Sequence, residues 1–138
     1  MKRSIALIAS FAVALSASAP AFAEMMTFKV MLDGKSETPP NDSKAKATAD
    51  VQVDTSAKTL TWTIKSDDLT GPATAAHFHG PAAVGAKAPP EIDISKMIDK
   101  GTSPLTDAQL ADFEAGKIYL NIHTAKFPDG EIRGQVTK

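Results

Sequence analysis

Short runs of alternating apolar and polar residues, each ended by a turn signal, constrain the fold of this chain more than any other feature of its sequence. The clearest run is 59–65, in which Leu60, Trp62 and Ile64 alternate with threonines and a lysine. Successive side chains of a strand point to opposite faces, so this run predicts a strand with one buried face. Comparable short runs bounded by turn residues predict further strands at 28–32, 47–53, 73–80, 92–94, 117–124 and 130–136.

One segment, LTDAQLADFEAGK, has the signature of a helix. Thr106 can cap its start, Gln109 three residues later completes a capping box, and Gly116 supplies a stop. About seven short strands with a single short helix predict an all-β fold, either an antiparallel β-sandwich or a Greek-key barrel.

The first 23 residues have the pattern of a secretory leader. Lys2 and Arg3 precede an apolar stretch of ~15 residues, which is shorter than the ~20 that a membrane-spanning helix needs. The small residues of Ala-Phe-Ala then precede Glu24, as at a signal-peptidase site. We therefore expect residues 1–23 to be a cleaved signal peptide and residues 24–138 to form one domain. We also expect the protein to be periplasmic or secreted, with no membrane contact after cleavage.

Composition excludes several classes of protein. The chain has no cysteine, which rules out a disulfide framework, a thiolate metal site and a cysteine nucleophile. No dense basic patch with interleaved aromatic residues is present, so we expect no nucleic-acid partner. The sequence also lacks the glycine-rich phosphate loop of nucleotide-binding enzymes and the motifs of common hydrolases.

The three histidines of the chain are placed where one shared site can form. His77 and His79 are two residues apart in the predicted strand 73–80, so they share a face, and Phe78 points to the other side. His123 lies in the predicted strand 117–124, on a face with other polar residues. If the two strands are neighbours, three imidazoles meet and predict a metal site. The alternative is three unrelated polar residues.

Three imidazoles without a thiolate favour copper, with zinc as the alternative metal. Three neutral ligands also leave a coordination position open, as catalytic sites do. Arg133 lies two residues after Glu131 and is expected on the same face of the last strand, where an ion pair between them is the plain interpretation. A guanidinium beside an open metal position would instead attract small anions.

Three blocks, LDGKSETPP, AAHFHGPA and YLNIHTAKFPDGEIRGQV, resemble the CHRD domain in their order and spacing. That family takes its name from the repeats of chordin and also occurs as single-domain bacterial secreted proteins. The resemblance covers about residues 27–137. In animal chordin the repeats belong to an extracellular protein that binds bone morphogenetic proteins, so the resemblance implies an extracellular binding module with a protein partner as one function. The positions that match the family motifs are Glu37, Pro39, Pro40, His77, His79, Gly80, Pro81, Asn121, His123, Gly130, Glu131, Arg133 and Gly134.

The order of the histidines and Arg133 is also similar to the copper site of copper-containing superoxide dismutases, although this chain lacks their bridging histidine, zinc ligands and disulfide. The similarity implies that Arg133 guides superoxide to copper that cycles between Cu(II) and Cu(I). In this hypothesis Glu37 or Glu131 orients a histidine through its second ring nitrogen. The leading interpretation is an exported copper-binding protein with superoxide dismutation as its candidate reaction. The alternatives are a binding module without enzymatic activity and a copper carrier.

Overall fold

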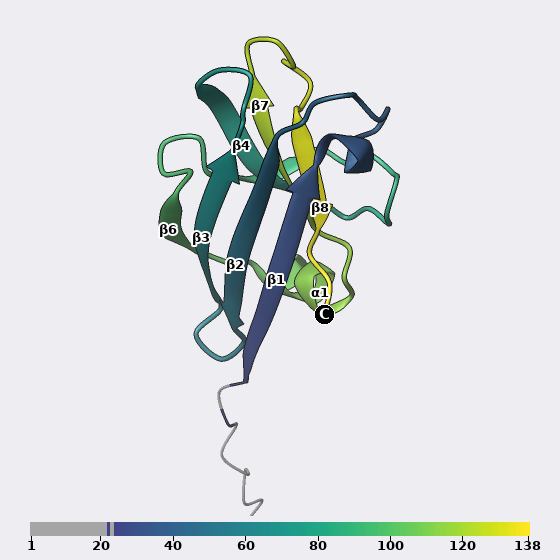
Figure 1. Cartoon of the computed structure of the whole chain (residues 1–138). Helices are drawn as coiled ribbons and strands as arrows, with labels where there is room; N and C mark the ends of the chain where they lie inside the picture. The colour runs from purple at the N-terminus through teal and green to yellow at the C-terminus, as the bar shows by residue number, and fades with distance from the viewer. Residues whose placement is uncertain (1–21, 23) are drawn as a thin grey trace, which may run out of the picture.

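The computed structural model describes residue 22 and residues 24–138, so the predicted signal peptide lies almost entirely outside the described residues. The described chain forms one antiparallel sheet of eight strands, in the order β5-β4-β7-β8-β1-β2-β3-β6 (Figure 1). One short α-helix and one 3₁₀ helix complete it, and the predicted all-β fold is confirmed. The elements are β1 Met25–Asp33, η1 Gly34–Ser36, β2 Lys46–Asp54, β3 Thr59–Asp67, β4 Ala73–His79, β5 Pro90–Asp93, β6 Lys100–Pro104, α1 Asp107–Glu114, β7 Tyr119–Thr124 and β8 Ile132–Gln135.

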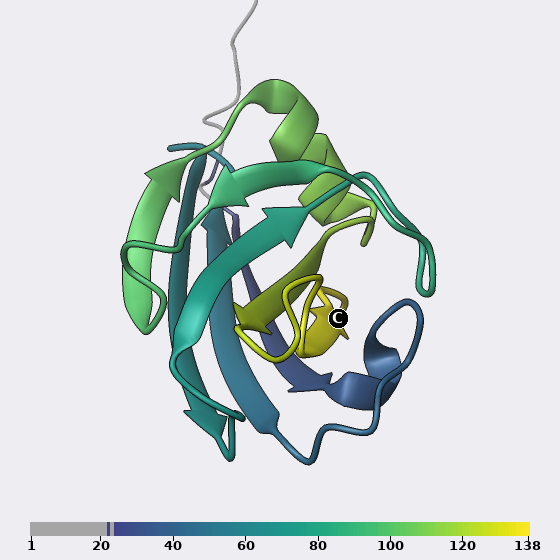
Figure 2. The ribbon, with the colours of Figure 1, turned by 90° about the horizontal axis from the view of Figure 1, so that it is seen from above.

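The sheet curls on itself, and the link between β3 and β4 shows why it must. These strands are five places apart in the sheet, which is ~24 Å if the sheet were flat. The connecting residues 68–72 can span only ~20–22 Å when fully extended. The sheet therefore bends until β4 and β7 pass behind β2 and β3, giving the nearly closed shape seen in Figures 1 and 2.

Aromatic side chains fill the space between the two walls of the curled sheet. Phe78 of β4 lies between Trp62 of β3 and Phe113 of α1, with ring centres 6.0 and 5.9 Å away. All three side chains are buried. The alternation predicted for the strands 59–65 and 73–80 is confirmed. Trp62 and Phe78 enter the core, and the two histidines beside Phe78 point to the opposite face.

Strand β6 was not predicted from the sequence. Its residues, KGTSP, show no alternation of apolar and polar side chains, and it pairs with β3 at the edge of the sheet. Gly101 faces Trp62 across this pair, and a Cβ at that position would collide with the indole ring. Backbone pairing with β3 and the space that Gly101 leaves for the Trp62 ring define this strand. Neither produces a hydrophobic pattern in the sequence.

Helix α1 begins and ends as predicted. The Thr106 hydroxyl accepts a hydrogen bond from the Gln109 N–H at 3.2 Å, and the Gln109 side chain accepts one from the Thr106 N–H at 3.0 Å. Gly116 follows the helix with a φ of +67°, the left-handed region that favours glycine. Among the described residues, no helix has the length and apolar character needed to cross a membrane.

Loops cover the outer face of β4 and β7. The loop that follows β1 and the loop that follows β4 project on the same side of the sheet (Figure 2). They are joined where the Thr38 hydroxyl donates to the Gly85 carbonyl at 3.1 Å. Polar side chains of β4 and β7 are consequently enclosed between the sheet and these loops.

Candidate metal centre

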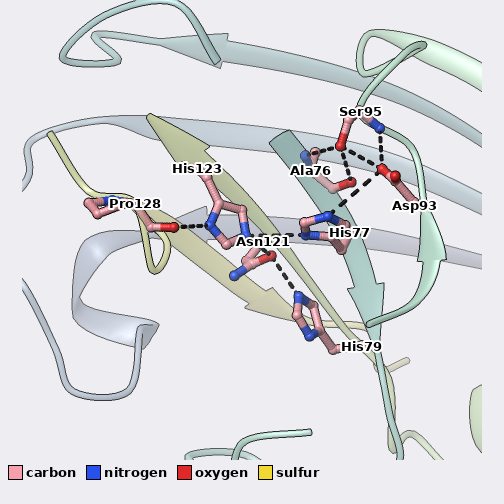
Figure 3. Close-up of polar contacts among 8 residues, drawn as sticks. All are labelled: Ala76, His77, His79, Asp93, Ser95, Asn121, His123 and Pro128. Carbon is pink, nitrogen blue, oxygen red and sulfur yellow. Dashed lines mark hydrogen bonds and ion pairs between the residues drawn. The ribbon is translucent and has the colours of Figure 1, made fainter. Parts of the chain in front are cut away.

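The three histidines meet at one point on the outer face of the sheet. Strands β4 and β7 are neighbours, with His77 opposite Asn121 and His79 opposite Tyr119. One nitrogen from each histidine lies within 4.8 Å of the other two, and His77 Nδ1 is 3.2 Å from His123 Nε2 (Figure 3). Ligands about 2.0–2.1 Å from a tetrahedral ion lie roughly 3.3–3.4 Å apart. The predicted convergence of three imidazoles is confirmed.

Backbone carbonyls determine which nitrogen of two rings carries the proton. His79 Nδ1 lies 2.9 Å from the Ala88 carbonyl oxygen, and His123 Nδ1 lies 2.8 Å from the Pro128 carbonyl oxygen. A carbonyl oxygen only accepts, so each Nδ1 must donate. In the neutral rings both Nε2 atoms are therefore bare lone pairs, and both point to the centre of the cluster.

The side chain of Asn121 brings a further lone pair to the same point. Its Oδ1 atom is 3.0 Å from His79 Nε2 and 3.0 Å from His123 Nε2 (Figure 3). Its Nδ2 atom lies on the side of Glu37, since a Cβ added at Gly130 would meet both groups, at 2.9 and 2.5 Å. Reversing the amide would place its oxygen against a carboxyl group. Three acceptor atoms thus face one another, and a neutral His77 ring can give a proton to only one of them, from its Nδ1 atom 3.2 Å from His123 Nε2. A bound cation satisfies all of these lone pairs at once.

Burial keeps two of the rings in the form that binds metal. Desolvation lowers the pKa of His77, and the neighbouring His123 and His79 lower it further. Desolvation also lowers the pKa of His79, which is only 8% exposed. A metal ion competes with protons for these nitrogens, so a lowered pKa favours metal binding.

Asp93 faces the remaining nitrogen of His77 without forming a hydrogen bond to it. Its Oδ1 atom is 3.8 Å from His77 Nε2, and the same oxygen accepts hydrogen bonds from the backbone N–H and hydroxyl of Ser95, at 2.9 and 2.5 Å. A carboxylate behind a ligating histidine orients the ring and raises its basicity. The sequence analysis missed this residue, although its alternation in the predicted strand 92–94 was a usable signal.

Glu37 lies beside the cluster, and no hydrogen bond or ion pair joins it to a histidine. Its side chain is 8% exposed, and its Oε1 atom has no hydrogen-bond partner. Burial raises the pKa of Glu37 to about 7, against the opposing effect of the Arg133 charge. The expectation that Glu37 orients a histidine is therefore corrected: it lies behind Asn121, the residue that touches His79 and His123 directly.

Glu131 lies elsewhere, and its expected contact with a histidine is also corrected. Its carboxylate accepts hydrogen bonds from the hydroxyls of Ser43, Thr124 and Thr70, at 2.6, 2.6 and 2.9 Å. Burial alone would raise its pKa, but these hydrogen bonds hold the pKa below its usual value. The rule that residues two apart share a face of a strand does not apply to Glu131, because it lies just before β8 begins. Its backbone N–H donates to the Ile122 carbonyl. It shares no face with Arg133.

Arg133 does lie beside the cluster, as part of a stack. The guanidinium carbon is 3.5 Å from the ring centre of Tyr119, and that ring stacks on His79 with centres 4.6 Å apart and an interplanar angle of 5°. Strand β7 runs between β4 and β8, so Tyr119 lies between the other two groups. Arg133 is only 2% exposed and forms no ion pair with Glu131 or any other described residue.

A cavity of about 190 Å³ adjoins the cluster. His79, His123 and Arg133 line it, together with Lys87 and Glu37. The cavity gives a small molecule a place to approach the histidine nitrogens, and its wall holds two cationic side chains, Lys87 and Arg133, and two acidic ones, Glu37 and Asp129.

The family comparison covers this whole arrangement. The family model of the CHRD domain matches residues 28–136. The chain belongs to the CHRD domain family. The three histidines, Asn121 and Arg133 all lie inside the matched segment, so the candidate metal centre is part of the CHRD domain itself. No curated protein and no solved structure gave a significant match.

Proposed function

We propose that this CHRD domain is an exported copper-binding protein that catalyses the dismutation of superoxide. The observation that carries the proposal is the convergence of one ring nitrogen from each of His77, His79 and His123 beside the Asn121 amide oxygen, with Nε2 of His79 and His123 unprotonated. Imidazole donors with no thiolate suit copper or zinc, and only copper adds one-electron chemistry. Export is supported by the leader pattern of residues 1–23.

The chain's own residues have distinct roles in this proposal. His79 and His123 present Nε2 to the ion, since a backbone carbonyl holds each Nδ1 proton, and His77 presents Nδ1 while Asp93 faces its Nε2. Bound copper would supply one-electron exchange between Cu(II) and Cu(I). Two superoxide anions and two protons would yield dioxygen and hydrogen peroxide.

Arg133 is proposed to attract and position the anion. It lines the cavity beside His79 and His123, where Lys87 adds a second positive charge and Glu37 and Asp129 add acidic groups. The whole chain has a formal charge of −1, so any attraction for an anion must be local. A buried guanidinium next to an open metal position supplies such a local field.

The metal claim is tested by titrating metal-free protein with Cu(II) and recording its electron paramagnetic resonance. We expect one copper per chain with nitrogen hyperfine structure, lost in His79→Ala and retained in Asp50→Ala, which removes an exposed carboxylate outside the site. Weak Cu(II) binding without defined stoichiometry, or a spectrum unchanged by His79→Ala, would refute the proposed metal site.

The catalytic claim needs a separate measurement on the copper-loaded protein. Superoxide decay followed by pulse radiolysis should be fast, slower at high salt, and reduced about tenfold or more in Arg133→Gln by loss of local attraction. Arg133→Lys should retain part of the rate. Tight copper binding without superoxide-dependent turnover would instead favour a copper carrier. If the domain binds a protein partner equally well after a chelator has removed the metal, the function of a non-enzymatic binding module would be favoured.

A further inference from the structure

Arg133 is a buried cation whose charge is poorly matched by its neighbours. A guanidinium carries five N–H donors, and removing its charge from water is costly unless a partner is present. Its two hydrogen bonds are long, 3.4 Å to the Thr38 hydroxyl and 3.5 Å to the Gln135 side-chain oxygen, and both acceptors are neutral. None of the ion pairs among the described residues includes it. The Glu37 carboxyl group is close enough for its charge to interact with that of Arg133, and the guanidinium face lies on the Tyr119 ring, but neither group pairs with the N–H donors of Arg133. The group therefore has spare donors.

These donors border a second and larger cavity, on the side of the chain where the two covering loops meet. Its volume is about 430 Å³, within the ~300–1,000 Å³ typical of small-molecule sites. Arg133 and Lys35 supply positive charge to its wall, while Pro40 and Val84 supply apolar surface. No histidine lines it. This cavity adjoins the one beside the metal centre, with which it shares Glu37, Thr38 and Arg133, but it does not reach the histidines.

The shape of the cavity depends on contacts between elements far apart in the sequence. The Thr38 hydroxyl both donates to the Gly85 carbonyl and accepts from Arg133, so it joins the two covering loops above β8. The Gln135 amide nitrogen is held by the carbonyls of Ala82 and Gly116, at 2.8 and 3.0 Å, which leaves its oxygen for the guanidinium. The binding group is thus held in place before any ligand arrives.

We infer that this cavity binds a small organic molecule with one carboxylate, which pairs with the Arg133 guanidinium while its apolar part lies against Pro40 and Val84. A carboxylate matches the planar fork of arginine. Glu37 also lines the cavity, and its carboxylate would repel a dianion such as phosphate more strongly than a monoanion. An inorganic ion alone would leave most of the volume and the apolar wall unused. The inference is independent of copper, since metal-free protein already contains every group involved.

The test is a nuclear magnetic resonance titration of metal-free, ¹⁵N-labelled protein with sodium butyrate, with neutral butyramide and inorganic phosphate in parallel. We expect saturable butyrate binding with a Kd of about 1 mM or lower, shifting the Arg133 Nε–H and the amides of Thr38 and Gly85. Arg133→Gln should weaken binding at least tenfold. Lys29→Gln, which removes an exposed lysine elsewhere on β1, should bind as the parent does.

A second pair of variants keeps the test valid if Arg133→Gln fails to fold. Val84 is highly exposed at the cavity wall, so its replacement should leave the fold intact. Val84→Glu should weaken butyrate binding by charge repulsion, whereas Val84→Gln should not. Equal shifts with butyramide, tighter binding of phosphate, or no saturable change with butyrate would each overturn the inference. Each of these outcomes can occur with or without copper binding, so this result is separable from the metal proposal.

Discussion

The inner face of β4 and β7 is fully buried and the outer face is partly buried, and the two faces use burial in opposite ways. On the inner face Ala76, Phe78, Leu120 and Ile122 pack into the core with no exposed surface. On the outer face, polar side chains one residue away in each strand are enclosed by loops instead of by the opposite wall of the sheet. The same pairing of β4 with β7 therefore supports an apolar environment on one face and a polar environment on the other.

The difference lies in how completely each face is satisfied by the protein alone. Apolar side chains need only contact, and the inner face provides it through Phe78 against Trp62 and Phe113. Lone pairs need a proton or a cation, and the outer face leaves His79 Nε2, His123 Nε2 and Asn121 Oδ1 facing one another. A partly buried cluster whose lone pairs lack protons, placed on a fully packed core, is the pattern of a binding site.

The largest expected effect breaks the inner face. Phe78→Ala removes a fully buried ring and should lower the free energy of unfolding by about 3–5 kcal/mol, measured by urea or guanidinium denaturation. The neighbouring substitution on the outer face, His77→Ala, should lower the free energy of unfolding of metal-free protein by less than about 1 kcal/mol, because it removes no side chain from the hydrophobic core. Comparable losses from both variants would refute the distinction between the faces.

Metal should complete the outer face and leave the inner face unchanged. Zn²⁺ at about one hundred times its Kd should raise the free energy of unfolding by about 2.7 kcal/mol, because it binds the folded chain. The stabilisation should vanish in His123→Ala and persist in Thr61→Ala, an exposed position on β3. Denaturation with and without the ion measures it. A stabilisation that survives in His123→Ala would place the ion elsewhere.

The carboxyl group beside the cluster should give a pH-dependent effect of about 1–3 kcal/mol. Burial raises the pKa of Glu37 from 4.5 to about 7, so the folded state holds this proton more tightly than the unfolded chain. The resulting stability is complete below pH 4.5 and is lost as the pH rises through 7. Glu37→Gln cannot ionise and should therefore be more stable than the parent above pH 7, with the advantage disappearing toward pH 4.5.

This comparison must be made on metal-free protein, with the parent and Glu37→Gln unfolded at the same series of pH values. His77 and His79 act in the opposite direction, because their lowered pKa values remove stability as the pH falls below 6.5. They are present in both proteins, so their contribution cancels in the difference. A difference that does not vary with pH would show that Glu37 is ionised to the same extent in both states.

The smallest effect concerns the support of one ligand. Asp93→Asn replaces the carboxylate that faces His77 Nε2 by a neutral amide and should reduce metal affinity about tenfold, or ~1.4 kcal/mol. Asp67→Asn, an exposed carboxylate at the end of β3, serves as the matched control. Competition for Zn²⁺ against a coloured chelator measures both affinities. Equal affinities would mean that Asp93 contributes only its hydrogen bonds to Ser95.

Local rules predicted the elements with clear chemistry and missed those without it. The run around Trp62 and the capping box at Thr106 and Gln109 each carry a pattern that one segment satisfies alone. β6 carries no such pattern, because its partner strand, not its own side chains, defines it. The expected contact of Glu131 failed for a related reason: alternation holds only inside a regular strand, and this residue lies just outside β8.

The sequence by itself determined which side chains share a face: His77 with His79 and away from Phe78, since strand geometry links residues two apart. Tertiary structure alone decided that β4 and β7 are neighbours, which brings His123 to the other two rings. It also decided which nitrogens are free, because the carbonyls of Ala88 and Pro128 come from separate loops and a backbone carbonyl leaves no trace in residue type. Periodicity is a property of one segment, whereas convergence of lone pairs requires several segments to meet.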